Sequence, residues 1–352
     1  MTSRKRIKSD DRSSDVNQRT DKFRPNERLD RLIVELSERL TPVQKQVNLE
    51  FEVPQEPIGL ILGSPRSGTT VLLQFFAACQ AFSYPTNLLS RFAYAPYVGA
   101  LTQKMLFDPE YDYMGELGDI ESYRDYASEL GKSKGILAAS EFFHFWRKYI
   151  PRYLPEHVNE KEIENIDFAD LSRSLASVES ALGKPFITKG LFLQYNLTAF
   201  YERMPYLFFI RIAREPIYVM QSIWFSRLDN YGSTDAWFSV KPREFESLRK
   251  LDVYHQIAGQ VYYTERAIEE GLEQIPEDRQ IKTDYEEFCS NPGLLYMKIV
   301  EKYRALGCEL DEHYDGPDAF ESSRQLKLPL DDIQCLESAY DDFVTGKIVL
   351  DN

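Results

Sequence analysis

The stretch Ile58-Gly-Leu-Ile-Leu-Gly63-Ser-Pro-Arg-Ser-Gly68-Thr-Thr70 decides the fold of this chain. A short apolar run ends in a turn rich in Gly, Ser and Pro. An apolar segment with the length of a helix follows, Val71-Leu-Leu-Gln-Phe-Phe-Ala-Ala78. This pattern predicts a strand, a loop and a helix in succession. Such a loop directs several backbone N–H groups at one point, at the positive end of a helix dipole, and therefore favours the binding of an anion.

The spacing of the two glycines in the loop indicates which kind of anion it binds. Gly63 and Gly68 have the G-x-x-x-x-G spacing of a phosphate-binding P-loop. A nucleoside triphosphatase would continue with Lys, whereas this chain continues with Thr69, so Arg66 is the only cation inside the loop. We therefore expect the loop to bind phosphate without hydrolysing ATP. For the loop taken alone, a glycine-rich turn without a ligand is the alternative.

Length and composition bound the class of protein. The chain has 352 residues, of which 43% are hydrophobic, which suits one large α/β domain or two small ones. Its net charge of −14 argues against a nucleic-acid binder or a protein that binds anionic membranes. An anionic ligand must therefore be held by locally placed cations.

Neither the cysteines nor the histidines have the spacing of a metal site. The 4 cysteines are scattered without a C-x-x-C motif, and the 4 histidines show no ligand-like spacing, so we expect no disulfide framework and no bound metal. The sequence has no long apolar run, and its basic start lacks the apolar core of a signal peptide. We therefore expect a cytoplasmic protein without a transmembrane segment.

The pattern along the chain predicts one α/β domain with short extensions. Residues 1–27 are polar and are expected to form a disordered N-terminal arm. Residues 28–50 are expected to form a helix that ends before Pro42, with an extended lead-in. Strands alternate with helices over 51–330, which predicts a single three-layer, P-loop-like domain with a central, mostly parallel sheet flanked by helices. Residues 331–352 are expected to form a C-terminal helix or tail.

A second motif follows the buried apolar run that ends at Ala213. Arg214 lies at the carboxyl end of this expected strand, where α/β sheets bind ligands, and Ser222 lies eight residues later on the next helix. Arg214 can fork onto a phosphate while Ser222 donates a hydroxyl hydrogen bond to it. The alternative is an ordinary ion pair between Arg214 and an acid such as Glu215. Two anion sites at strand ends suit a nucleotide with phosphate at both its 5′ and 3′ positions.

Together with Tyr285-Glu-Glu-Phe-Cys-Ser-Asn-Pro292, these motifs resemble those of the sulfotransferases that use 3′-phosphoadenosine 5′-phosphosulfate (PAPS), in their bacterial form. The resemblance extends over residues 58–306. It implies PAPS as co-substrate, adenosine 3′,5′-bisphosphate (PAP) as product and no required metal. Arg214 and Ser222 match the 3′-phosphate signature of the family. The loop for the 5′-phosphosulfate matches Pro65, Arg66, Ser67, Gly68, Thr69 and Thr70.

The chain also departs from the family pattern. Members that sulfate phenols and steroids carry a Lys-Thr-His segment whose His is the base, whereas this chain has Lys189-Gly190-Leu191. The usual C-terminal Arg-Lys-Gly segment is missing, and Arg324 in Ser322-Ser-Arg324 is the nearest candidate for a late contact with the 3′-phosphate.

Sulfuryl transfer requires an in-line arrangement and stabilised charge on the transferring oxygens. We expect Arg66 and the amides of the loop to hold the 5′-phosphate and the bridging oxygen, and Lys189 to reach the sulfuryl group. A general base must accept the proton of the acceptor. Glu141 and His144 are the candidates, and an i, i+3 spacing would place them on one helical face. Glu141 is preferred because several sulfotransferase groups use a Glu base; a structural His beside a capping carboxylate is the alternative.

The expected acceptor is a hydroxyl of a carbohydrate, a lipid or a small metabolite, without nucleic acid as a partner. Aromatic residues within 82–149 and the stretch 226–250, with Arg227, Trp237, Phe238 and Phe245, are expected to contact it. The sequence predicts no oligomeric state. Two other hypotheses remain open at this point: a P-loop kinase-like phosphotransferase and a noncatalytic nucleotide-binding protein.

Overall fold

The structure is a computed structural model that describes residues 19–116, 127–129, 132–150 and 155–350. Its centre is a parallel sheet with the strand order β4-β1-β5-β6. In this sheet β1 (Ile58–Leu62) lies between β4 (Ile187–Lys189) and β5 (Leu207–Ala213), and β6 (Gln280–Asp284) forms the far edge. Because all four strands are parallel, their carboxyl ends meet at one edge of the sheet.

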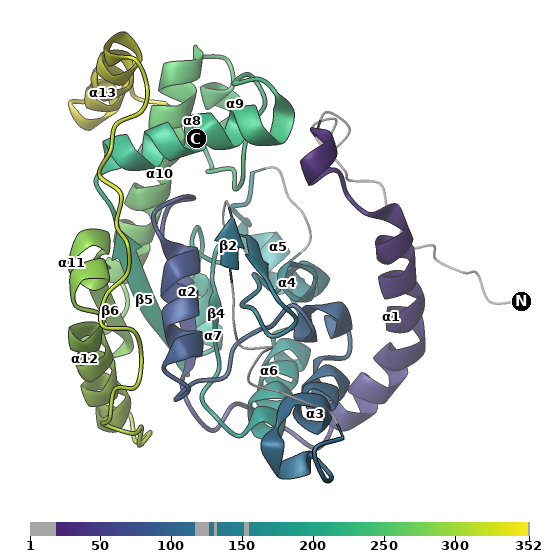
Figure 1. Ribbon diagram of the computed structural model, residues 1–352. Helices are drawn as coiled ribbons and strands as arrows, with labels where there is room; N and C mark the ends of the chain where they lie inside the picture. Colours follow the sequence, from purple (N-terminus) through teal and green to yellow (C-terminus); the bar gives the residue numbers. More distant parts are fainter. Residues whose placement is uncertain (1–18, 117–126, 130–131, 151–154, 351–352) are drawn as a thin grey trace, which may run out of the picture.

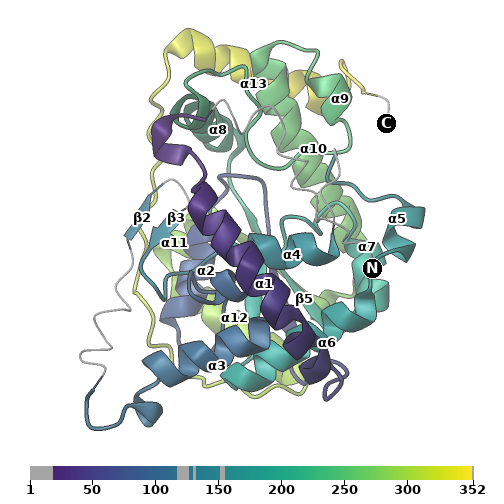
Figure 2. The same ribbon diagram turned by 90° about the vertical axis from the view of Figure 1, so that its right-hand side faces the viewer.

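Helices cover both faces of the sheet, as Figures 1 and 2 show. Alternate residues of the buried strands point to opposite faces. Leu60 and Phe209 face a cluster with α3 (Pro96–Phe107), α4 (Phe143–Tyr149), α6 (Phe168–Leu182) and α7 (Leu197–Arg203). Ile61 and Phe208 face a cluster with α2 (Thr69–Ala78), α11 (Tyr285–Ser290) and α12 (Pro292–Ala305). The three-layer α/β fold expected from the sequence is therefore confirmed.

A third core cluster joins α8 (Pro216–Tyr231), α10 (Val253–Glu273) and α13 (Leu330–Val344). The C-terminal helix of the chain is thus packed against the body of the protein. Arg227, Trp237 and Phe245 are buried here. The expectation that these three side chains contact an acceptor is wrong, because they pack α8, α9 (Phe245–Leu248) and the loop before α9 onto α10.

The N-terminal part differs from expectation in two ways. Helix α1 (Glu27–Asn48) continues through Pro42 instead of ending before it. The part of the expected disordered arm that the structure describes is fixed against α8: the Thr20 amide donates to the Asn230 carbonyl at 2.8 Å, and Phe23 is buried. Residues 1–18 lie outside the described residues. Figure 2 shows α1 crossing the molecule over α4 and α6.

The other elements are short. The motif 285–292 forms the short helix α11 and the start of α12. An antiparallel hairpin stands apart from the main sheet. None of the helices in the described parts of the chain is long and apolar enough to cross a membrane. The remaining elements are η2 (Asp21–Phe23), η3 (Leu89–Phe92), η4 (Pro109–Tyr111), β2 (Ala127–Glu129), β3 (Lys132–Lys134), α5 (Glu160–Glu164), α9 (Phe245–Leu248) and η6 (Glu277–Arg279).

Candidate active site

The sequence motifs converge on the carboxyl edge of the sheet. The loop 63–68 follows β1, Lys189 is the last residue of β4, Arg214 follows β5, and Tyr285 follows β6. The strand order then fixes the order along the edge: Lys189, the loop, Arg214 and Tyr285. Ligands of open α/β sheets bind at this edge. Four chain segments that are far apart in sequence therefore form one candidate site.

Close contacts hold the loop in shape. A Cβ added at Gly63 would lie 2.5 Å from Ser67 Oγ and 2.8 Å from the Ile212 carbonyl oxygen, so no side chain fits there. Gly68 has φ = 107°, and its added Cβ would lie 2.4 Å from the Tyr285 ring. The Tyr285 ring leaves no space for a side chain at Gly68, so the motif after β6 packs directly onto the loop after β1. Both glycines are required by space as well as by backbone shape.

The amides of the loop divide into two groups. The Ser67 amide, expected to face a phosphate, donates instead to the Ser64 carbonyl at 3.1 Å and closes the turn. The Ser64 amide donates to Glu265 Oε1 at 3.1 Å. By contrast, Thr69 and Thr70 begin α2, and the first amides of a helix have no acceptor within it. The helix N-terminus therefore supplies the donors for an anion, at the positive end of its dipole.

Arg66 connects the loop to α8. Its Nε donates to Ser222 Oγ at 2.9 Å, and its backbone has φ = 73°. Burial lowers the pKa of the Arg66 guanidinium, and the positive charge of nearby Arg214 lowers it further. The sequence predicted that Ser222 and Arg214 contact the same phosphate. In the structure the Ser222 hydroxyl accepts a bond from Arg66, which leaves its own hydrogen to donate to a ligand. Two arginines that repel each other in a buried setting form a strong site for an anion.

Arg214 is held by residues of the motifs 285–292 and 322–324. Its Nη2 donates to the Ser323 carbonyl at 2.6 Å, and its guanidinium lies 4.4 Å from the centre of the Tyr285 ring. Its Nε lies 3.9 Å from Glu286 Oε1, so the described ion pair is with Glu286 and not with the expected alternative, Glu215. Arg324 Nε lies 3.9 Å from the same Glu286 oxygen. The structure thus brings Arg324, a candidate from a distant part of the sequence, to Arg214.

Lys189 lies on the other side of the loop. Its side chain is 3% exposed, and its Nζ donates to Thr70 Oγ1 at 2.7 Å and to Glu141 Oε1 at 2.9 Å. The Glu141 side chain is 47% exposed. A buried ammonium group between the start of α2 and an exposed carboxylate can stabilise a negative charge that develops there.

Glu141 and His144 do not share a helical face. Helix α4 begins at Phe143, and Phe142 before it has φ = 53°, so Glu141 lies outside the helix. His144 is an exposed residue within α4, with its ring 5.4 Å from that of Phe143. The predicted i, i+3 pair on one helical face is therefore wrong, and of the two residues it is Glu141 that bonds to Lys189.

Sequence reasoning missed three residues of the site. Tyr285 and Glu286 belong to a motif that is weak by itself, and only the contacts with Gly68 and Arg214 give them a place. Gln221 precedes Ser222 and bonds to the backbone of the segment after Arg324: its Nε2 donates to the Gln325 carbonyl at 3.0 Å, and its Oε1 accepts from the Leu328 amide at 3.0 Å. No local sequence pattern predicts such a long-range contact.

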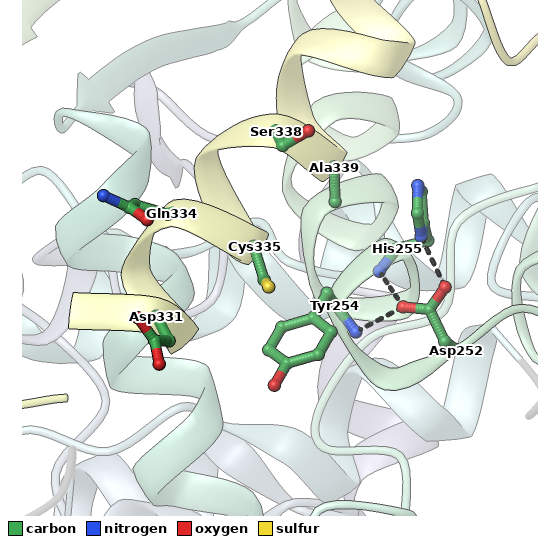
Figure 3. Close-up of a pocket in the computed structure, with 8 residues that line it drawn as sticks. All are labelled: Asp252, Tyr254, His255, Asp331, Gln334, Cys335, Ser338 and Ala339. Carbon is green, nitrogen blue, oxygen red and sulfur yellow. Dashed lines mark hydrogen bonds and ion pairs between the residues drawn. The ribbon is translucent and has the colours of Figure 1, made fainter. Parts of the chain in front are cut away.

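Two surface hollows lie at different places. One of about 510 Å³ borders the Arg214 side of the site and is lined by Asp284, Glu286, Glu287, Ser290, Ser322 and Arg324. The other, of about 460 Å³, lies between α10 and α13 (Figure 3). There His255 bonds to Asp252 at 2.6 Å and to Asp342 at 3.2 Å, which ties the two helices together. The second hollow includes none of the strand-end residues.

Comparison with solved structures identifies the fold. No protein-family model matches the sequence, and no curated protein matches it significantly. Among solved structures, sulfotransferase STF9 from Mycobacterium avium matches with a TM-score of 0.53 and 15% identity, over 96% of this chain and 89% of that one. Sulfotransferase STF1 from Mycobacterium tuberculosis matches with a TM-score of 0.47 and 12% identity, over 89% and 80%. The likeness to STF9 shows that the chain has the sulfotransferase fold, as its motifs implied.

Proposed function

We propose that this protein is a sulfotransferase that moves a sulfuryl group from PAPS to an acceptor hydroxyl. The observation that carries the proposal is the order of groups along the sheet edge. Lys189 lies on one side of the phosphate loop and Arg214 on the other. A donor with a sulfuryl group at its 5′ end and a phosphate at its 3′ position needs cations on both sides of such a loop. The sulfotransferase fold of the chain supports the same conclusion.

The residues present fit the two anionic ends of PAPS. The start of α2, Thr69 and Thr70, and the guanidinium of Arg66 suit the 5′-phosphate. Arg214 suits the 3′-phosphate: its side chain is 12% exposed, and its Nε has no hydrogen-bond partner among the described residues. A buried donor without an acceptor is costly unless a ligand supplies one. Arg324 lies close enough to Arg214 to join it.

When bound, PAPS supplies an activated sulfuryl group. Lys189 is placed to stabilise charge on that group and on the leaving oxygen, because its Nζ already bonds to Thr70 at the start of α2. Glu141 Oε1 accepts a hydrogen bond from the same ammonium group. We propose Glu141 as the base that takes the hydroxyl proton, with His144 as the alternative. The chemistry needs no metal, because a sulfate ester carries less charge than a phosphate ester.

The acceptor side is proposed at the start of α4. Phe142, Phe145 and Trp146 are fully buried and pack the core, so most aromatics of this region are structural. Phe143 is the exception: it is 41% exposed, it follows Glu141 by two residues, and its ring contacts that of Phe192 at 5.4 Å. An exposed aromatic face beside the base suits the ring of a sugar or of a small metabolite, or the chain of a lipid. We propose an acceptor of one of these kinds.

Calorimetric titration tests the donor assignment. PAP is titrated into the protein without metal, with 5′-AMP and ATP as comparison ligands. We expect micromolar binding of PAP and much weaker binding of 5′-AMP. Arg214→Ala should weaken PAP binding by about tenfold or more and leave 5′-AMP binding unchanged. Arg249→Ala is the matched control, since Arg249 is an exposed arginine that pairs with Glu246 outside the site.

The possible outcomes separate the three hypotheses. Equal loss of PAP and 5′-AMP in Arg214→Ala would contradict the assignment of the 3′-phosphate site. A preference for ATP with magnesium would favour the phosphotransferase. Selective PAP binding without turnover of any hydroxyl acceptor would favour a noncatalytic nucleotide-binding protein.

A further inference from the structure

We propose that Glu286 is an internal counter-ion for Arg214 and Arg324 and that the 3′-phosphate of the bound nucleotide displaces it. The inference rests on the proposed function and goes beyond it, because it assigns a carboxylate, not a cation, a role in donor selection. Glu286 would then be a positioning residue that sets how strongly the site prefers 3′-phosphorylated nucleotides.

The geometry around one oxygen atom carries the inference. Glu286 Oε1 lies 3.9 Å from Arg214 Nε and 3.9 Å from Arg324 Nε, which come from the end of β5 and from the segment after α12. It therefore lies between the two guanidinium groups that suit a phosphate. A phosphate oxygen placed between the same two groups would meet the carboxylate at the same position, so the two anions compete.

The bonding of this oxygen is incomplete. Glu286 is 11% exposed, and its Oε1 is buried without a hydrogen-bond partner among the described residues. Arg214 Nε lacks a hydrogen-bond partner in the same sense. At 3.9 Å the two groups attract each other by charge without forming a hydrogen bond. A loose pair of this kind is readily exchanged for a bidentate contact between arginine and phosphate, which is shorter and stronger.

The surroundings make the carboxylate a weak competitor. Burial raises the pKa of Glu286, and Asp284 raises it further through its charge and a side-chain hydrogen bond. A backbone hydrogen bond and the charge of Arg214 oppose this rise without cancelling it. Asp284 also lines the hollow beside Arg324, so a phosphate that enters it meets negative charge. Only a ligand that binds both Arg214 and Arg324 overcomes this repulsion.

The two arginines are held by other contacts when Glu286 is displaced. Arg214 keeps its hydrogen bond to the Ser323 carbonyl, one residue before Arg324. Gln221 fixes the segment just after Arg324 through the Gln325 carbonyl and the Leu328 amide. The exchange of one anion for another therefore needs a change at Glu286 alone and leaves the fold of the segment intact.

The test compares two substitutions that remove the same charge. Glu286→Gln keeps the shape of the side chain. Glu287→Gln removes the same charge one residue along the chain and is the control, because Glu287 is 52% exposed and pairs with Lys298 at 3.5 Å. PAP and 5′-AMP are titrated into wild type and both variants, and the thermal midpoint of each protein is measured. We expect Glu286→Gln to bind PAP about tenfold more tightly with unchanged binding of 5′-AMP, and Glu287→Gln to change either affinity less than about twofold.

Each other outcome contradicts the inference. Unchanged or weaker PAP binding in Glu286→Gln at an unchanged thermal midpoint would show that the carboxylate supports the arginines and is not displaced. If both variants bound PAP more tightly by the same factor, the effect would come from overall charge. The same would follow if Glu286→Gln bound 5′-AMP more tightly by as much as it bound PAP. Wild type that binds no PAP would overturn the proposed function together with the inference, whereas selective wild-type binding without an effect of Glu286→Gln overturns the inference alone.

Discussion

Lys189 joins Thr70 to Glu141: its ammonium group donates to the hydroxyl at the start of α2 at 2.7 Å and to the carboxylate before α4 at 2.9 Å. The first partner lies at the start of α2, directly after the phosphate loop, and the second precedes the exposed Phe143 by two residues. One buried cation thus connects the proposed donor side of the site to the proposed acceptor side. This arrangement explains why a lysine at the end of a short edge strand is buried.

Replacement of Lys189 should slow turnover more than it weakens nucleotide binding. In Lys189→Met the charge that stabilises the transferring group is lost, so we expect kcat to fall about 10²- to 10³-fold. PAP lacks the sulfuryl group, and its affinity should change less than about threefold. Steady-state kinetics and calorimetry of the same preparations measure both. Lys184→Met, at an exposed lysine just before β4, is the control. Parallel losses of turnover and affinity would place Lys189 in nucleotide binding.

The two candidate bases can be separated by substitution. Glu141→Gln keeps the side-chain shape and removes the proton acceptor, so we expect kcat to fall by about 10²-fold or more with unchanged PAP affinity. His144→Ala should lower kcat less than about fivefold, because His144 belongs to α4 while Glu141 bonds to Lys189. The reverse order of effects would assign the base to His144. Unchanged turnover in both variants would place the base elsewhere.

Gly68 should tolerate no side chain. In Gly68→Ala the added Cβ would lie 2.4 Å from a Tyr285 ring carbon at a backbone φ of 107°. The loop or the ring must move, so we expect loss of PAP binding by more than about tenfold in a protein that remains folded. Gly183→Ala is the matched control: Gly183 also has positive φ, but its Cβ meets nothing within 4 Å. That variant should lose only about 1 kcal/mol of stability and bind PAP normally. Similar PAP affinity in both variants would show that the contact is not needed.

The sequence predicted which strand ends carry the site, because each strand is recognised from its own run of apolar residues. The apolar runs before Gly63 and Arg214 are buried parallel strands, and such strands end at one edge of the sheet whatever the details of packing. The alternation of strands and helices was sufficient to predict the layers. The positions of Arg66, Lys189 and Arg214 at the edge follow from that pattern alone.

The sequence did not predict which groups pair across the site, because these contacts depend on tertiary packing. Ser222 was expected to contact a phosphate together with Arg214, and its bond from Arg66 was not predicted. Glu141 was expected on a helix, but the left-handed backbone of Phe142 places it before the helix starts. Residue spacing gives the face of a helix only where a helix exists, and neither pairing nor such a backbone change has a local signal.

Gln221 should affect 3′-phosphate binding although it need not touch the nucleotide. Its side chain fixes the backbone of the segment after Arg324 through Gln325 and Leu328. In Gln221→Ala these bonds are lost, so we expect PAP to bind about three- to tenfold more weakly and 5′-AMP to bind as before. Gln221→Glu keeps the acceptor for the Leu328 amide and should retain part of the affinity. Calorimetry with both ligands measures the effect, and equal losses for PAP and 5′-AMP would indicate a general disturbance of α8.

Asp170 should make stability depend on pH. Its carboxylate receives hydrogen bonds from Asn48 of α1 at 2.7 Å and from Lys148 of α4 at 3.0 Å, so it ties three helices together. Burial would raise the pKa of Asp170, but the charge of Lys148 and these hydrogen bonds outweigh it and lower the pKa. A carboxyl group with a lowered folded-state pKa stabilises the fold above its unfolded pKa, which is about 4, and loses that contribution as pH falls through the folded value.

Asp170→Asn should therefore destabilise the protein at neutral pH and much less in acid. The substitution leaves the part-buried Lys148 without its counter-charge, so we expect a loss of about 2–4 kcal/mol at pH 7. As pH falls through the lowered folded-state pKa of Asp170, wild type loses the same charge by protonation, and the difference should shrink. Urea unfolding at a series of pH values from neutral into acid measures it. Glu202→Gln, at an exposed carboxylate 3.7 Å from Arg203, is the control and should change stability little at any of these pH values. A difference that stays constant over the whole acid series would show that hydrogen bonding to Asn48, not charge, provides the stabilisation.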